Sequence, residues 1–440
     1  MRPLGSRKIS FGACRCAAGG VTRKIAACVT LAVALGAIGC DGSNTAAPGT
    51  TTADGSSARP QGDVLPAAAP LTSATPEGGT APSVGASAAA SAATTASPSE
   101  LGRTLPWDDK QKAGPPPAGW GERTQWDGTF EAQNALLFEE LAYFHGLDET
   151  ALARIKEIFA VGKHLGQGNP KAARHPASPA ACEQTLKDAE VDHDDREAAA
   201  ACGARYMARL YDPEKGETAS VAKICIDKFE FPNIPCRYPV TWVQANEAAE
   251  ICHAVGKRLC DAHEWEGACE GRLTPADYEW ERYAKMPEED ARKARRGRHN
   301  LEAGKQPRLA YGEKYEAGRC ATGSRKSRDC GVGWKNCGTN TYPAGMFPRC
   351  SNALGAFDLH GNAAEHMNLP ERPDELASLP LAQRKYGHTE MKGSWFIFDD
   401  FHAHEDHCRW RAPYWHGTRV MSKGSHGNYH LGFRCCKDVE

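Results

Sequence analysis

Apolar side chains recur at helical spacing in a few stretches of this chain. Over residues 134–160 they follow the i, i+3, i+4 pattern, and Gly146 interrupts it, so two helices joined by a short turn are predicted. Residues 197–210 carry a similar stripe and predict a further helix. Residues 243–255 predict another helix, which should end at Gly256 because glycine accepts the positive φ found at helix C-termini.

The pattern changes at about residue 219. Beyond it the segments are short, and Gly, Trp and Cys are dense, which is typical of a loop-rich domain that needs covalent bridges. We therefore divide the folded part into a mainly helical extension, residues 106–218, and a second domain, residues 219–440. The extension is interpreted either as packing against the second domain or as a surface that binds a partner.

The first 39 residues have the organisation of an export signal, a signal peptide over residues 1–39. A long basic segment precedes an apolar run over residues 25–38, which is shorter than the about 20 residues that a membrane-spanning helix needs. The run ends at Gly39 and Cys40, a pattern that resembles a lipoprotein signal in which Cys40 is lipidated and becomes the mature N-terminus. Ordinary secretion, with cleavage near Gly39, is the alternative.

Residues 40–105 consist mainly of Ala, Thr, Ser and Pro, with almost no large apolar side chains. Such a segment cannot bury enough surface to offset the entropy lost on ordering, so it is predicted to be a disordered tether. With a lipid on Cys40, the chain would be anchored to a membrane of the cell envelope and would face the periplasm or the exterior.

Cysteine usage indicates an oxidising compartment. The chain has 18 cysteines, an even number, and it contains no CxxC pair of the kind that zinc sites use. Disulfides are therefore favoured over a zinc protein. The net charge of −2 gives no reason to expect a nucleic-acid partner, and we expect a monomer.

Four short blocks in the C-terminal half carry a family resemblance. They are GKRL…EWE at 256–266, GAFDLHGNAAEH at 355–366, GSW at 393–395 and LGFRC at 431–435. In this order they resemble the formylglycine-generating enzyme (sulfatase-modifying factor) family. The resemblance implies an α+β fold, an irregular C-type-lectin-like domain with little regular secondary structure that disulfides hold together.

The resemblance also implies a calcium ion at the second block. Matched residue by residue, Asp358 and Glu365 would supply side-chain oxygens, and Gly361 and Ala363 would supply main-chain carbonyls. A hard dication prefers several oxygen ligands, which this set would offer. The alternative interpretation is a turn that caps a helix and carries surface carboxylates.

Two disulfides are implied by the same resemblance. The family's bridge between the cysteine before GKRL and the cysteine of GFRC maps to Cys252 with Cys435. A second family bridge uses the position of Cys269. Its usual partner position holds Ala412 here, so the nearby Cys408 is expected to take its place. Separately, Cys182 and Cys202 lie close enough in the sequence to bridge the helical extension. The other cysteines cannot be paired from the sequence.

The family's catalytic cysteines are not matched. The enzymes bind copper(I) through two cysteines shortly after an RGGS element and use oxygen to convert a substrate cysteine to formylglycine. Counted forward from Ser394, the first of the two positions is Ile397. Counted back from residues 409–411, the two positions are His402 and His407. Cys408 is the one thiol of this stretch.

Three histidines in this stretch offer a different centre. His402, His404 and His407 could form an imidazole site for copper or iron, with His402, His407 and Cys408 as catalytic residues. In the alternative interpretation they are solvent-facing residues of an insertion.

Two functions follow from these features. By descent the protein would be an oxidase or oxygenase that acts on a cysteine of an exported protein or peptide. Alternatively, it is a non-catalytic cell-envelope binding protein that uses the lectin-like fold to bind a peptide, a glycan or another envelope partner. Trp395, Trp410 and Trp415 could line a groove for such a partner or fill the core.

Overall fold

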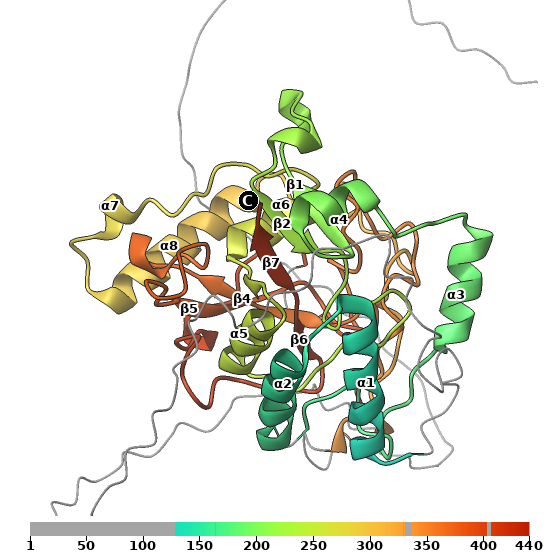
Figure 1. Ribbon diagram of the computed structural model, residues 1–440. Helices are drawn as coiled ribbons and strands as arrows, with labels where there is room; N and C mark the ends of the chain where they lie inside the picture. Colours follow the sequence, from blue (N-terminus) through green and yellow to red (C-terminus); the bar gives the residue numbers. More distant parts are fainter. Residues whose placement is uncertain (1–127, 163, 329, 331–335, 403–405, 440) are drawn as a thin grey trace, which may run out of the picture. The chain divides into compact units, whose positions relative to one another are not determined.

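Two helices at the start of the described structure match the first predicted helical region. They are α1 (Phe130–His145) and α2 (Glu149–Val161) in Figure 1. Gly146 follows α1 in a left-handed conformation with a φ of 61°, and the Asp148 side chain caps α2 by accepting a bond from the N–H of Ala151. The prediction of two helices and a short turn is therefore confirmed.

The structure is a computed structural model that describes residues 128–162, 164–328, 330, 336–402 and 406–439. These residues lie within one compact unit, Ala89–Glu440. The predicted signal peptide, the lipidated Cys40 and the tether lie outside the described residues. Among the helices that are described, none is both long and apolar enough to cross a membrane.

The remaining helices are separated by loops, and all of them except α8 have ten residues or fewer. They are α3 (Pro179–Asp188), α4 (Arg196–Cys202), α5 (Ala245–Ala254), α6 (Ala262–Glu270), α7 (Trp280–Tyr283) and α8 (Glu288–Ala303). Short 3-10 turns are η1 (Pro213–Lys215), η2 (Ala219–Val221), η5 (Pro373–Glu375) and η6 (Tyr414–His416). Gly256 lies just past α5 with a φ of 71°, as predicted.

The described strands form two small sheets. The strands are β1 (Met207–Leu210), β2 (Ile224–Asp227), β3 (Arg258–Leu259), β4 (Ala364–Leu369), β5 (His388–Lys392), β6 (Leu431–Phe433) and β7 (Cys435–Asp438). The first sheet has the order β1-β2-β7-β3 and is antiparallel throughout. In the second sheet, β4 pairs antiparallel with β5 and parallel with β6. This is the predicted α+β fold with little regular structure.

The helix predicted for residues 197–210 is wrong in its second half. α4 ends at Cys202, because the following Gly203 takes a left-handed conformation with a φ of 59°. Residues Met207–Leu210 form β1 instead and pair with β2, so that Met207 lies opposite Asp227. The apolar side chains of this stretch are buried by sheet pairing and not by a helical stripe.

The helical extension packs against the rest of the domain. α2 lies beside α5 (Figure 1), and Ile155 of α2 shares a buried core with Ala248 of α5. Two disulfides attach the extension covalently, Cys182–Cys236 and Cys202–Cys225, instead of the suggested bridge between Cys182 and Cys202. The structure therefore agrees with packing, the first of the two interpretations of the extension.

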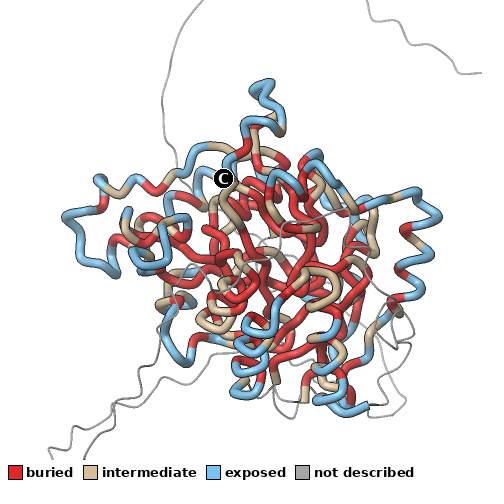
Figure 2. The backbone as a smooth tube through the Cα atoms, viewed as in Figure 1, coloured by how far each residue is buried: buried red, intermediate tan, exposed pale blue. Residues whose placement is uncertain are grey.

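Five further disulfides hold the described domain together. Cys252 is bonded to Cys435 and Cys269 to Cys408, the two pairs that the resemblance implied. The others are Cys260–Cys436, Cys320–Cys350 and Cys330–Cys337. Figure 2 shows that the backbone through both sheets is buried, so these bridges reinforce a core that is formed by short elements.

Candidate functional site

The second motif block forms an irregular turn before β4. Asp358, Gly361 and Asn362 have positive φ values of 56°, 87° and 59°. A Cβ on Gly361 would lie 2.8 Å from the main-chain oxygen of Ala321, so a residue with a side chain does not fit there. The N–H of Gly361 donates to Oγ of Ser394 at 2.8 Å, which ties this turn to the third block.

Glu365, which lies on β4, is paired with an arginine of the last block. The guanidinium Nε and Nη2 of Arg434 donate to the two carboxylate oxygens of Glu365 at 2.7 Å each. Nε1 of Trp265 donates to the same carboxylate at 3.0 Å. Glu365 and Arg434 are both buried, and a bidentate pair of this kind combines charge with fixed geometry.

Two further buried carboxylates interact with this pair. Glu230 accepts a bond from the N–H of Ala363 at 3.1 Å, and burial together with the charges of Asp358 and Glu365 raises its pKa well above the ordinary value. Asp358 accepts a bond from the N–H of Gly345 at 2.6 Å through Oδ2, whereas its Oδ1 is buried without a hydrogen-bond partner among the described residues. Burial raises the pKa of Asp358 to about 6.

These contacts test the predicted calcium site. Glu365 accepts three hydrogen bonds at its carboxylate, one at Oε1 and two at Oε2. Among the described residues, Asp358 and Glu365 belong to no group of three ligand side chains whose atoms lie within 4.8 Å of one another. The predicted site uses two side chains and two main-chain carbonyls, so calcium bound by Asp358, Glu365, Gly361 and Ala363 stays a prediction.

The raised pKa of Asp358 predicts a pH dependence of stability. The pKa of Asp358 rises from its ordinary value of 3.8 to about 6 in the folded protein. Its contribution to the free energy of unfolding is therefore fully present below about pH 3.8 and is lost as pH rises through about 6. Asp358→Asn keeps an oxygen acceptor and tolerates a positive φ. We therefore expect its free energy of unfolding, measured by urea denaturation in EDTA, to fall less than that of the wild type between about pH 4 and pH 7.

The control for this measurement is Glu139→Gln, which changes an exposed carboxylate on α1 and should leave the wild-type slope unchanged. Equal slopes for Asp358→Asn and the wild type would contradict the prediction. Repeating the denaturation series with calcium tests the predicted calcium site. A bound ion would lower the pKa of Asp358 and reverse the pH dependence of the free energy of unfolding.

The segment after the third block occupies the position of the family's cysteine pair. Ile397 is buried in a cluster with Trp395 and Tyr429, so Trp395 serves the core. His402 is exposed, and its ring stacks on Phe398 with centroids 4.2 Å apart. Of the positions matched to the family's copper-binding cysteines, Ile397 is thus apolar and buried, and His402 is at the surface.

The predicted histidine centre is only partly described. His407 is partly buried, and Cys408 is bonded to Cys269, which removes the free thiol that a catalytic role for Cys408 requires. Neither His402 nor His407 belongs to a described group of three ligand side chains. The predicted copper or iron site also needs His404, which lies outside the described residues. The site therefore stays a prediction.

His360 is a polar residue of this region that the sequence interpretation missed. It precedes Gly361 in the turn, is 2% exposed, and places Nδ1 against Oδ2 of Asp406. The rings of Tyr311 and Tyr315 lie 5.8 and 5.6 Å from the His360 ring, centroid to centroid. The sequence did offer two signals for this pair. His360 lies inside the second motif block, and Asp406 lies within the histidine-rich stretch.

The arrangement around His360 restricts its ring. A carboxylate beside Nδ1 fixes the tautomer, whereas Nε2 is buried without a hydrogen-bond partner among the described residues. The Tyr315 hydroxyl donates to Asp399, and burial together with this bond raises the pKa of Tyr315, so the phenol stays protonated at neutral pH. The described part of this region contains no free thiol.

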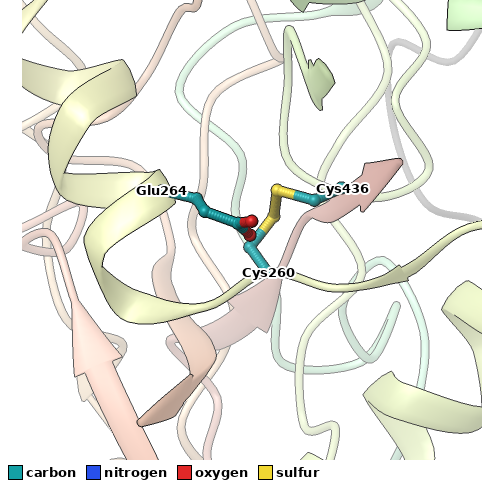
Figure 3. Close-up of side chains that lie close together, drawn as sticks. All are labelled: Cys260, Glu264 and Cys436. Carbon is teal, nitrogen blue, oxygen red and sulfur yellow. A yellow bond between two sulfur atoms is a disulfide. The ribbon is translucent and has the colours of Figure 1, made fainter. Parts of the chain in front are cut away.

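One group of side chains elsewhere has metal-ligand spacing, but its sulfurs are bonded to each other. Cys260 and Cys436 form a disulfide with the Glu264 carboxylate beside it (Figure 3). Arg258 donates to both oxygens of Glu264 at 2.7 Å. Because thiolates are absent and the carboxylate is paired, this group is structural.

A second such group, Glu288, Glu371 and His388, also has partners of its own. Arg419 donates to Glu288 at 2.8 Å, and Nε of Arg292 lies 3.9 Å from Glu371. Two guanidinium groups thus already neutralise the carboxylates. We interpret this group as an ion-pair network that joins α8 to β5.

Comparisons with known proteins agree with the motif blocks. A family model described as "Sulfatase-modifying factor enzyme 1-like domain" matches residues 198–439. Among solved structures, the chain is similar to PvdO from Pseudomonas aeruginosa, with 14% identity over 53% of this chain and 91% of that chain and a TM-score of 0.26. It is also similar to CarF, with 11% identity over 49% and 87% and a TM-score of 0.24. No curated protein matches the chain significantly.

Proposed function

Because the chain belongs to the family of sulfatase-modifying factor enzyme 1-like domains, we propose that it is a cell-envelope protein that uses this fold to bind a partner and does not oxidise cysteine. A lipid on Cys40 would anchor it, and the tether over residues 40–105 would let the domain reach away from the membrane. The partner would be another exported macromolecule.

One observation carries this proposal: the described domain has no thiol left for copper. Every cysteine from Cys182 onward lies in a disulfide. Copper(I) is a soft ion that thiolates suit, and the family's enzymes hold it with a pair of them. Ile397 and His402 stand where the family has its copper-binding cysteines, and Cys408 is in a disulfide. The copper ion that the family uses to convert cysteine to formylglycine would therefore lack its thiolate ligands.

Thiol mapping in the full-length chain tests this proposal. The protein is alkylated with and without prior reduction, and the labelled cysteines are identified by mass spectrometry of its peptides. We expect no label from Cys182 onward without reduction and full labelling after it. Incubation with copper(I), oxygen and cysteine-containing peptides should produce no aldehyde and consume no more oxygen than copper alone.

Labelling of Cys269 and Cys408 in unreduced protein, together with aldehyde formation, would overturn the proposal. A variant with His402→Ala and His407→Ala identifies the source of any such activity. Activity that survives the variant would be assigned to thiols, whereas activity lost in it would be assigned to the histidines.

A second candidate is an oxidase or oxygenase that works through histidines. It is favoured by the ring of Tyr315, which lies 5.6 Å from the His360 ring and 6.4 Å from the His402 ring, so both imidazoles border one aromatic cluster. In this alternative, His360 would move a proton while Asp406 holds its tautomer. His360→Gln, which should leave folding intact, would then abolish turnover in the peptide assay.

A further inference from the structure

A basic pocket lies beside the segment that occupies the family's cysteine positions. Its volume is ≈ 970 Å³, and its walls come from residues 169–176, residues 323–328 and two asparagines, Asn336 and Asn340. Ser324 in one wall donates its N–H to the carbonyl of Phe396 at 2.7 Å. One wall of the pocket is therefore attached to residues 394–402.

The pocket gathers positively charged side chains. Five cationic side chains line it, Lys171, Arg174, Arg325, Lys326 and Arg328, and its lining includes no Asp or Glu. None of the five forms an ion pair with another residue in the described ranges, although the chain as a whole has a net charge of −2. Clustered like charges repel, so an anion that enters the pocket would relieve this repulsion.

Two of the cations are held in place. The Arg174 guanidinium donates to the carbonyl of Ala173 at 2.6 Å, and Nζ of Lys326 lies over the rings of Trp395 and Phe401, 5.2 and 4.9 Å from the centroids. Both side chains are exposed, and these contacts favour one position for each charge.

Hydrogen bonds also connect the two walls of the pocket. Oγ of Ser327 donates to the carbonyl of Ala172 at 3.1 Å, and Oδ1 of Asn340 accepts from the N–H of Arg174 at 2.6 Å. The amide of Asn340 donates in turn to the carbonyl of Arg325 at 2.7 Å. Such cross-links reduce the ordering cost of binding, which is what a preformed ligand site requires.

The lining chemistry indicates the class of ligand. Guanidinium groups match carboxylate and sulfate geometry, and the side chains of Asn169, Asn336 and Asn340 offer donors and acceptors to hydroxyl groups. The lining has no aliphatic or aromatic residue larger than Pro176, so it lacks the apolar hollows that anchor peptide side chains. From these observations we infer that the pocket binds an acidic oligosaccharide, one that bears carboxylate or sulfate groups. This inference rests on the proposed binding function and names its ligand.

The test is calorimetric titration of the full-length protein with four probes: tetragalacturonate, a heparin hexasaccharide, neutral maltotetraose and a decaglutamate peptide. We expect one or both acidic saccharides to bind, with an affinity that falls as salt is raised, and we expect maltotetraose not to bind. Preference for tetragalacturonate would identify carboxylate as the recognised group, and preference for the hexasaccharide would identify sulfate.

Charge reversal at the pocket supplies the matched comparison. Replacing Arg325, Lys326 and Arg328 with glutamate should weaken saccharide binding by about a hundredfold, since each lost charge-assisted contact is worth roughly a factor of five or more. The same replacement at Lys285, Lys293 and Lys423, which are exposed and lie outside the pocket lining, changes the net charge equally and should leave the affinity unchanged. Thermal unfolding checks that both variants remain folded.

Three results would overturn the inference. They are failure of both acidic saccharides to bind, equal loss of affinity in the two triple variants, and decaglutamate binding as tight as that of the better saccharide. The thiol mapping and aldehyde assays are separate measurements. Aldehyde formation would overturn the proposed function whatever the pocket binds, whereas absence of both aldehyde and saccharide binding would remove only the inference about this pocket.

Discussion

Removing both bridges that fasten β7, Cys252–Cys435 and Cys260–Cys436, should destabilise the domain by more than the sum of the two single removals. The bridges join nearly the same two points of the chain, with sequence separations of 183 and 176. While one bridge is present, the other closes only an additional loop of about ten residues, worth about 2.7 kcal/mol by the loop-entropy relation. Removing both also opens the loop of about 40 residues that Cys269–Cys408 leaves between these points, for a total of about 6–7 kcal/mol.

Paired alanine substitutions measure this coupling. Urea denaturation of the wild type, of Cys252→Ala with Cys435→Ala, of Cys260→Ala with Cys436→Ala, and of the quadruple variant gives the four free energies of unfolding. We expect a coupling of roughly 1 kcal/mol, or loss of any cooperative transition in the quadruple variant. The control removes Cys330–Cys337, which has a separation of 7 and should add independently to either pair. Additive costs for the two β7 bridges would contradict the loop argument.

Arg434→Met should produce the largest loss of stability of any single substitution in the motif blocks. Arg434 uses all its N–H groups, donating to Glu365 and to the main-chain carbonyls of Asp227, Lys228 and Phe357. It also compensates the buried charges of Glu365, Glu230 and Asp358. Breaking a buried pair typically costs about 3–5 kcal/mol, because the remaining charge is left uncompensated.

The pH dependence of this variant separates charge from packing. Without Arg434 the buried carboxyl groups have higher pKa values, so the loss of stability should shrink as pH falls toward about 6, the pKa of Asp358 in the wild type. A deficit that stays constant with pH would assign the effect to lost packing. Arg154→Met, which breaks an exposed ion pair with Glu157 and Glu250, is the control and should cost less than about 1 kcal/mol.

The sequence predicted the fold through features that act locally. Gly146 and Gly256 end helices because of their positive φ, and Asp148 begins a helix because its side chain accepts a main-chain N–H. These residues determine their own backbone conformation, so a short stretch is enough to recognise them. The motif blocks likewise lie where the resemblance implied, with the second block leading into β4.

The features that sequence could not supply are set by partners far along the chain. Met207–Leu210 forms a strand only because β2 is available to pair with it, and a local apolar stripe does not reveal that partner. The motif that placed Glu365 in a calcium site likewise did not reveal that Arg434, from the other end of the domain, pairs with its carboxylate. The basic pocket could not be predicted for the same reason, since its two walls are about 150 residues apart in the sequence.

The position of β7 has a consequence for how the protein is made. β7 lies between β2 and β3, so the first sheet stays incomplete until the last residues of the domain have been synthesised. Cys182–Cys236 and Cys202–Cys225 can close early, whereas Cys252 waits for a partner 183 residues downstream. At about 5–20 residues per second, this delay is about 10–40 s. In that interval Cys252 and Cys260 are unpaired thiols that neighbouring cysteines can capture, so the yield of native protein depends on the rate at which wrong disulfides are reshuffled.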